Sequence, residues 1–248
     1  MSKGDDENKE VGSNKSVREL RRRNTLDGLE ITNNPRAETH ADDEVDKFIG
    51  AGDQGEVYRA THKNGEEVAL KIPISGYPDY NKMQLLEYTM KKAMRQVLED
   101  KGDPDQDRVN KVYNIEKSTE SFVDSQKQHT LPFTMELRRE GTAEDLEDKN
   151  PQLYIKEKKQ IEKLVSRLDK LGFYLGEDIM KDDNLYVKDD KLQLGDCGGV
   201  KVDKGSTADK YFQKELKKAE EVVGASKLKP EEIYSDRSLQ AEKSGKNL

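Results

Sequence analysis

The sequence has few of the residues that form disulfides, membrane spans and large apolar cores. Its 248 residues include one cysteine, Cys197, and no tryptophan, and only 32% of the chain is apolar. One cysteine excludes an internal disulfide and is typical of a reducing compartment. The sequence also lacks a run of about 18 apolar residues that could span a bilayer. We therefore expect a soluble protein with no membrane span.

An excess of basic residues is missing as well. The chain carries 44 Lys and Arg against 51 Asp and Glu, a net charge of −7. Proteins that bind a phosphate backbone or an anionic bilayer rely on surplus positive charge. We therefore expect no nucleic-acid partner.

Apolar and aromatic residues are unevenly distributed, which divides the chain into three parts. Residues 1–42 hold no aromatic residue and are rich in charge, so we expect a disordered polar leader that also lacks the apolar core of a secretory signal. Residues 43–224 carry the folded domain, and residues 225–248 form a polar tail.

Within the domain, hydrophobic periodicity indicates both strands and helices. Three antiparallel strands are expected in "DKFIGAG", "EVYRATH" and "EEVALKI", because Asn-Gly between the last two is a strong hairpin signal. Apolar steps of three and four predict helices elsewhere. The remaining expected elements are helices at 80–98, 151–171 and 208–223, short strands at 110–117, 120–124 and 130–137, and a strand pair within 184–196 that turns at two aspartates.

Three glycines lie at the connection between the first two expected strands. Gly50, Gly52 and Gly55, followed by Val57, form the pattern GxGxxGxV. In a dinucleotide-binding fold such glycines lead from a strand into a helix, whereas here they join two strands. A glycine hairpin can close its backbone over phosphates because no Cβ is in the way. A plain flexible hairpin is the alternative at this point.

The stretch "VALK" at 68–71 follows at a spacing that resembles the protein kinase superfamily. The resemblance implies that the glycine hairpin covers ATP, that Val57 and Ala69 enclose the adenine, and that Lys71 holds the phosphates. It also implies that "FTMEL" joins two lobes, with Met135 as gatekeeper and the backbone of Glu136, Leu137 and Arg138 at the adenine edge. Strand residues with no special role are the alternative for that stretch.

A buried lysine needs a carboxylate partner, and the expected helix 80–98 offers one. Glu87 lies four residues after Met83 and three before Met90, on or beside the apolar stripe. Since an unpaired carboxylate facing a core is costly, the position favours an ion pair with Lys71. A glutamate at the stripe's edge that reaches water is the alternative.

The second half of the chain has the motifs "DIMKDDNLYV" and "LQLGDCGG", which resemble a kinase catalytic loop and its metal-binding Asp-x-Gly. A strand pair between them would bring Asn184 and Asp196 together. Amide and carboxylate oxygens suit Mg²⁺, so we expect these two as metal ligands and ATP with Mg²⁺ as the cofactors.

The catalytic loop departs from the family pattern. His-Arg-Asp is replaced by Gly176-Glu177-Asp178, and alignment on Lys181 and Asn184 puts Ile179 at the base position. Isoleucine cannot accept a proton. Either a one-residue bulge delivers Asp178, which we favour, or the base is missing. Lys181 would help neutralise the transferring phosphoryl.

These features predict an α+β, two-lobed protein-kinase-like fold with an N-lobe at 43–137 and a truncated helical C-lobe at 138–224. The chain has Cys197 in place of the usual Phe, lacks Ala-Pro-Glu, and continues for only 52 residues after Asp196 (248 minus 196). Such reduction resembles the type III secreted effector kinases of the OspG and NleH group. That resemblance implies delivery into a host cytoplasm and a host activator such as a ubiquitin-charged conjugating enzyme. Action in the bacterial cytoplasm is the alternative.

The predicted activity is ATP- and Mg²⁺-dependent transfer of the γ-phosphoryl group to Ser or Thr hydroxyls of a protein substrate. Two other interpretations stay open. One is a pseudokinase, which uses the same fold as a module for binding nucleotide or a partner. The other is a small-molecule kinase of the aminoglycoside or choline type.

Overall fold

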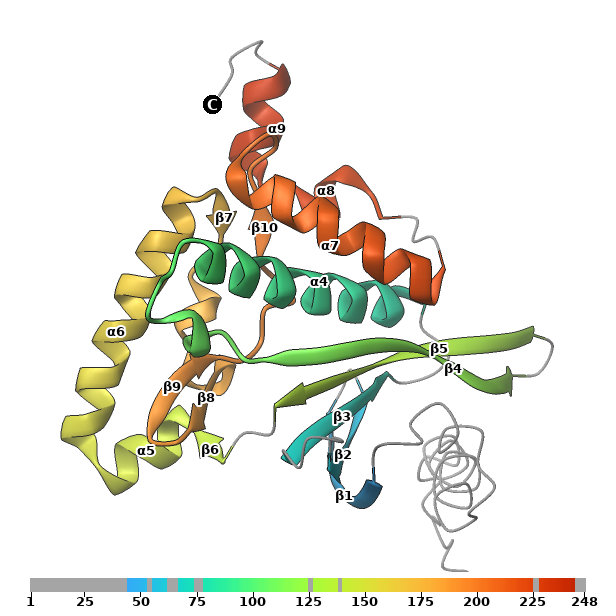
Figure 1. Ribbon diagram of the computed structural model, residues 1–248, viewed down its shortest axis with the longest axis horizontal. Coiled ribbons are helices and arrows are strands. Elements are labelled where there is room, and N and C mark those ends of the chain that lie inside the picture. Colours follow the sequence, from blue (N-terminus) through green and yellow to red (C-terminus); the bar gives the residue numbers. More distant parts are fainter. Residues whose placement is uncertain are drawn as a thin grey trace, which may run out of the picture.

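The computed structural model in Figure 1 describes residues 44–52, 55–61, 67–73, 78–124, 127–137, 140–224 and 228–243. Helices and small antiparallel sheets alternate along these segments, so the expected α+β class is confirmed. The predicted polar leader at 1–42 lies outside the described residues. No helix in the segments above combines the length and apolar character needed to cross a membrane.

A five-stranded antiparallel sheet is formed by the first half of the chain (Figure 1). Its strands are β1 (Glu44–Gly52), β2 (Gly55–Thr61), β3 (Glu67–Pro73), β4 (Val112–Asp124) and β5 (Lys127–Leu137), in the order β1-β2-β3-β5-β4. The three consecutive strands predicted from the Asn-Gly signal are confirmed. The two short strands expected at 110–117 and 120–124 are one strand, β4, because a register shift between Lys117 and Ser121 absorbs the polar residues between them.

Helix α4 (Pro78–Asp100) packs against this sheet, and α7 (Thr207–Val223) runs antiparallel beside it (Figure 1). The stripe that predicted α4 is buried at Leu86, Met90, Met94 and Val97. At the end of α4, Asp100 Oδ2 accepts a hydrogen bond of 2.7 Å from the Tyr211 hydroxyl of α7. Both helices therefore contact the sheet, α4 along β3, β4 and β5, and α7 at β4.

The other half of the chain is mainly helical. Its elements before α7 are β6 (Gly141–Thr142), α5 (Ala143–Lys149), α6 (Pro151–Lys170), β7 (Phe173–Tyr174), β8 (Leu185–Lys188), β9 (Lys191–Leu194) and β10 (Lys201–Val202), with the 3₁₀ turns η3 (Asp178–Met180) and η4 (Asp182–Asn184). A further 3₁₀ turn, η2 (Gln106–Arg108), lies between α4 and β4. Helix α6 begins where expected, because the Asn150 side chain accepts a hydrogen bond from Leu153 N and Pro151 follows the cap.

The turn between β8 and β9 falls on the predicted aspartates. Asp189 and Asp190 have φ angles of 50° and 56°, which suits a two-residue hairpin loop whose central residues both take the left-handed conformation. Aspartate tolerates this conformation better than most residues. The strand pair predicted within 184–196 is therefore confirmed, and its turn fixes its register.

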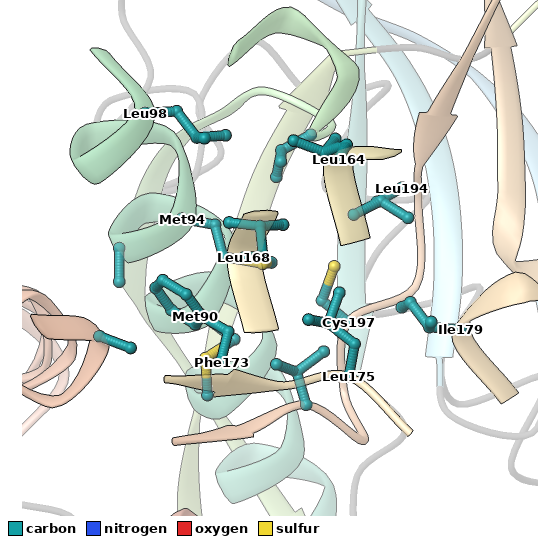
Figure 2. Packing of buried hydrophobic residues seen from close by; sticks show 14 of the residues in the cluster. Met90, Met94, Leu98, Leu164, Leu168, Phe173, Leu175, Ile179, Leu194 and Cys197 are labelled. Carbon is teal, nitrogen blue, oxygen red and sulfur yellow. The ribbon is translucent and has the colours of Figure 1, made fainter. Parts of the chain in front are cut away.

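The hydrophobic core lies between α4, α6 and the small strands that follow α6. Figure 2 shows Met90 and Met94 from α4 packed with Leu168 and Phe173, and Cys197 in the same cluster. These side chains are almost completely removed from solvent. One cluster therefore joins the helix that lies on the large sheet to the segment that contains the candidate metal ligand Asp196.

Beyond residue 224 the sequence predicted only a polar tail, whereas the structure shows two short helices, α8 (Pro230–Ile233) and α9 (Asp236–Lys243). Ile233 is buried, and Ser235 N donates a hydrogen bond of 3.0 Å to Val202 O on β10. Lys82 of α4 forms an ion pair of 3.3 Å with Glu232. Composition did not indicate this packing because it depends on a few apolar side chains, such as Ile233 and Tyr234, and on several polar contacts.

Candidate active site

The glycine hairpin joins two strands, as the sequence predicted. Gly50 pairs with Val57 and Gly52 with Gly55 across β1 and β2, and residues 53 and 54 lie outside the described part. On the other side of β2, Val57 pairs with Lys71 of β3. The hairpin therefore lies one strand away from the candidate phosphate lysine.

Lys71 forms the predicted ion pair with α4. Its Nζ lies 2.7 Å from Glu87 Oε2, and its backbone oxygen accepts a hydrogen bond of 2.7 Å from Gln84 Nε2. Glu87 is only 4% exposed, so the alternative of a glutamate reaching water is wrong. The Lys71 side chain keeps 21% of its surface open to solvent. It can therefore meet a ligand while Glu87 holds it.

A second lysine, Lys91, contacts the other oxygen of the same carboxylate. Its Nζ lies 2.7 Å from Glu87 Oε1, and its side chain is fully buried. Sequence reasoning did not identify Lys91 as a site residue. The available signal was its position four residues after Glu87 and three before Met94, which places it inside the apolar stripe.

These contacts change the acidity of Glu87. Burial alone would raise the pKa of this carboxyl, but the two ammonium groups of Lys71 and Lys91 attract the carboxylate and donate hydrogen bonds to it. The result is a pKa lowered to about 2. Glu87 therefore stays ionised throughout the range in which proteins usually work.

This low pKa predicts a loss of stability in acid. Because the Glu87 carboxyl titrates near its ordinary pKa of 4.5 when unfolded and at about 2 when folded, its contribution is present above pH 4.5 and is lost as the pH falls to 2. The stability lost across this window is ~3 kcal/mol. Urea denaturation at several pH values should show this loss for the native chain. Glu87→Gln should show a smaller acid slope, to which carboxyls such as Asp105 still contribute, since, although burial opposes it, the pKa of Asp105 is also lowered by its arginine partners.

Glu99→Gln is the matched control for that measurement, because Glu99 is an exposed glutamate of the same helix. Its acid slope should equal that of the native chain. An unchanged slope in Glu87→Gln would contradict the low pKa of Glu87.

The expected adenine edge lies on β5, next to β3. Met135 pairs with Leu70, Glu136 with Ala69, and Leu137 with Val68. Arg138 lies outside the described residues. The strand that carries Lys71 is therefore flanked by the glycine hairpin on one side and by this segment on the other.

Asn184 and Asp196 meet at the open end of the β8–β9 hairpin. The Asn184 backbone oxygen accepts hydrogen bonds from Gly195 N, at 2.9 Å, and from Asp196 N, at 3.3 Å. The residue between the strand and Asp196 must be small, because a Cβ on Gly195 would lie 2.4 Å from the Tyr186 ring. The predicted convergence of the two candidate metal ligands is therefore confirmed at the level of the backbone.

The side-chain contacts of these two residues leave oxygen atoms for a cation. Asn184 Nδ2 donates to Asp178 O at 2.8 Å, which leaves its side-chain oxygen for another ligand. Asp196 Oδ1 accepts from Gly198 N at 2.9 Å. In the described segments, no cluster of three or more His, Cys, Asp or Glu could hold a metal by itself. An amide and a carboxylate oxygen fit Mg²⁺ where phosphate and water complete its shell.

Asp178 and Ile179 have opposite environments in η3. Ile179 is 4% exposed and belongs to the hydrophobic core, whereas the Asp178 side chain is 80% exposed. Asp178 pairs with Lys181 at 2.6 Å, and this contact raises the pKa of Lys181. Of the two candidates for the base position, only Asp178 therefore offers a carboxylate to a ligand.

Helix α6 holds this loop in place through two residues that sequence reasoning missed. Lys158 Nζ donates to Met180 O at 2.7 Å and forms an ion pair with Asp182. The Tyr154 hydroxyl donates to Asp182 at 3.0 Å. Both residues lie on α6, which precedes the loop in the chain. The only feature in the sequence that could have identified them is that they are polar residues near the apolar stripe of this helix.

The two parts of the site are connected through the residues just before β4. Asn110 N donates to Leu194 O at 2.9 Å, two residues before Asp196, and Arg95 of α4 donates to Val109 O at 2.6 Å. In Figure 2, Met90, one turn after Glu87, and Cys197, next to Asp196, belong to the same core cluster. The ion pair and the hairpin end therefore border one packed unit.

A scan against models of known protein families finds no match, and no curated protein matches the chain. The function of the chain is therefore inferred from the geometry of its candidate site. This site consists of an ion pair beside a glycine hairpin, an amide and a carboxylate at a hairpin end, and an exposed carboxylate on the loop bonded to that amide.

Proposed function

We propose that the chain is a protein kinase that transfers the γ-phosphoryl group of ATP to Ser or Thr hydroxyls. The observation that carries the proposal is the 2.7 Å ion pair between Lys71 of β3 and Glu87 of α4, next to the strand that follows the glycine hairpin. In kinases, a strand lysine that holds the ATP phosphates is fixed by a glutamate of the helix behind it.

The arrangement of elements supports a two-lobed kinase-like fold. A five-stranded sheet with α4 packed on it occupies the region assigned to the N-lobe, 43–137. The region assigned to the C-lobe, 138–224, contains α5, α6, α7 and the β8–β9 hairpin. On this proposal ATP lies between the two, with its adenine between Val57 and Ala69 and its phosphates toward Lys71.

Lys71, Asn184 and Asp196 have separate tasks in this mechanism. Lys71 binds the phosphate oxygens and is oriented by Glu87, while the oxygens of Asn184 and Asp196 hold Mg²⁺. When bound, Mg²⁺ neutralises charge on the phosphates. The protein thus accelerates transfer mainly by positioning groups and by fixed charge, since phosphoryl transfer needs little covalent chemistry from side chains.

Asp178 orients the substrate hydroxyl and accepts its proton. Its backbone oxygen is bonded to Asn184 Nδ2, which keeps the base next to a metal ligand. Its pairing with Lys181 places an ammonium group beside the base, where the charge of the transferring phosphoryl develops.

The short segment after Asp196 supports a reduced kinase. Between Asp196 and the start of α7 at Thr207 the described chain has β10 as its only strand, which leaves little room for an activation segment. Regulation by a partner then replaces regulation by loop phosphorylation. The proposal includes a host protein activator, such as a ubiquitin-charged conjugating enzyme, and delivery to a host cytoplasm by type III secretion.

A second candidate function is a nucleotide- or partner-binding module that does not transfer phosphate. One observation favours it. The residue at the aligned base position, Ile179, is buried in the core, and Asp178 already has an ion-pair partner in Lys181. Such a pseudokinase would bind ATP and leave protein substrates unlabelled.

The proposal predicts that ATP with Mg²⁺ raises the melting temperature of the native chain, and that the chain transfers labelled phosphate to a general protein substrate. The first variant to test is Lys71→Met. It should bind ATP about 10- to 100-fold more weakly than the native chain, because charge-assisted hydrogen bonds from the Lys71 ammonium to phosphate are lost. Thermal melting over an ATP titration measures this effect.

Lys92→Met is the matched control for that titration. Lys92 lies on α4 and contacts the Tyr88 ring instead of Glu87. It should bind ATP like the native chain. Binding without transfer would favour the pseudokinase, labelling of an aminoglycoside or choline alone would favour a small-molecule kinase, and absence of binding would overturn the proposal.

A further inference from the structure

Glu87 is shared between two lysines that differ in position and exposure. Lys71 approaches Oε2 from β3 and is partly open to solvent, whereas Lys91 approaches Oε1 from the same helix and is fully buried. Each oxygen thus has its own ammonium at 2.7 Å. The three side chains together carry one net positive charge.

The contact with Lys91 does not depend on where β3 lies. Since Lys91 is four residues after Glu87 on α4, the helix itself sets their separation. The contact with Lys71, by contrast, joins two elements that are 16 residues apart in the chain. If Lys71 turns toward a ligand, Glu87 still has a buried partner and does not become an uncompensated charge.

Sharing the carboxylate also affects what Lys71 can bind. In a simple ion pair Glu87 would neutralise Lys71 completely, and an arriving anion would meet little net charge. With Lys91 present, its buried ammonium group offsets part of the negative charge of the Glu87 carboxylate. An anionic ligand at Lys71 therefore meets a positive site in surroundings where charges act strongly.

We propose that Lys91 is a positioning residue that holds Glu87 through Oε1, so that Lys71 is available to bind a polyphosphate. The identity of that ligand as ATP rests on the proposed function, whereas the hold on Glu87 does not. The lysine that would contact the ligand is Lys71, and Lys91 acts through Glu87.

The first experiment is a cycle of urea denaturation on the full chain with Lys71→Met, Lys91→Met and the double variant. Each single variant leaves Glu87 one lysine, so its unfolding equilibrium constant should rise less than about tenfold. The double variant leaves a buried carboxylate unpaired, so the constant should rise by more than about 100-fold beyond the product of the two single effects.

A third substitution keeps this cycle decisive if the double variant does not fold. Adding Glu87→Met to the double variant removes the unpaired charge and should restore folding to the level of the single variants. Two results would overturn the proposal: single effects that multiply to give the double effect, or a triple variant as unstable as the double.

The second experiment measures ATP affinity in the presence of Mg²⁺ by calorimetry. Lys91→Met should bind ATP about tenfold more weakly than the native chain, because Glu87 then neutralises Lys71. Lys92→Met should bind normally. Equal affinity in Lys91→Met would overturn the positioning role. If the native chain does not bind ATP, the proposed function fails, and the stability cycle still decides whether Lys91 holds Glu87.

Discussion

Asp196→Asn is expected to lower phosphoryl transfer about 10³-fold while the fold is kept. The carboxylate lies at the hairpin end, where the Asn184 backbone oxygen accepts from Asp196 N. An amide at position 196 can still accept the hydrogen bond from Gly198 N, but it removes the negative charge that, on the proposed function, would bind Mg²⁺. The measurement is labelled-phosphate transfer by the two proteins over a range of Mg²⁺ concentrations.

The matched control for this substitution is Asp190→Asn, on the same hairpin. Asp190 is exposed at the turn with φ of 56°, a conformation that asparagine also adopts, so activity and stability should not change. Higher Mg²⁺ should recover part of the activity of Asp196→Asn, because weaker ligation is partly offset by mass action. Full activity of Asp196→Asn at low Mg²⁺ would contradict its role as a metal ligand.

Arg108→Met is expected to destabilise the fold by about 3–5 kcal/mol, which is the cost of leaving one partner of a buried ion pair alone. Arg108 of η2 pairs with Glu157 of α6, and both side chains are nearly buried. Arg108 also donates to Leu192 O at 3.3 Å and to Asp105 at 2.9 Å. Urea denaturation at neutral pH measures the loss.

The double variant Arg108→Met with Glu157→Leu separates a lost charge pair from lost packing. Removing both charges leaves an apolar contact of similar volume, so stability should recover to within about 1–2 kcal/mol of the native chain. If the double variant is as unstable as Arg108→Met alone, the destabilisation comes from the shape of Arg108 and its bonds to Leu192 and Asp105.

Much of the fold follows from local sequence signals. The strands around the Asn-Gly turn, the stripe of α4 and the aspartate turn between β8 and β9 were predictable because each depends on periodicity or on a left-handed turn. The continuity of β4 was not predictable, because the polar residues in its middle resemble a loop in the sequence. In the structure a register shift between Lys117 and Ser121 keeps them within the strand. Helices α8 and α9 were missed because they bury few apolar side chains.

The candidate site was predictable where a buried charge without a partner would destabilise the fold. Glu87 on an apolar stripe required a cation, and Lys71 supplied it. Lys91 was missed because a lysine beside a stripe usually extends its stem along the core and places its charge in water. Lys158 was missed because its contact with Met180 O depends on how α6 lies against the loop, which spacing along the chain does not determine.

The polar contacts that hold α4 differ between its two ends. Near its carboxyl end, Arg95 bonds to Val109 O, and Asp100 accepts from Tyr211. At its amino end, Lys82 forms a partly exposed ion pair with Glu232 of the C-terminal segment. A protein that displaced α8 would remove this ion pair on the helical turn that precedes Glu87, and Glu87 is the residue that holds Lys71.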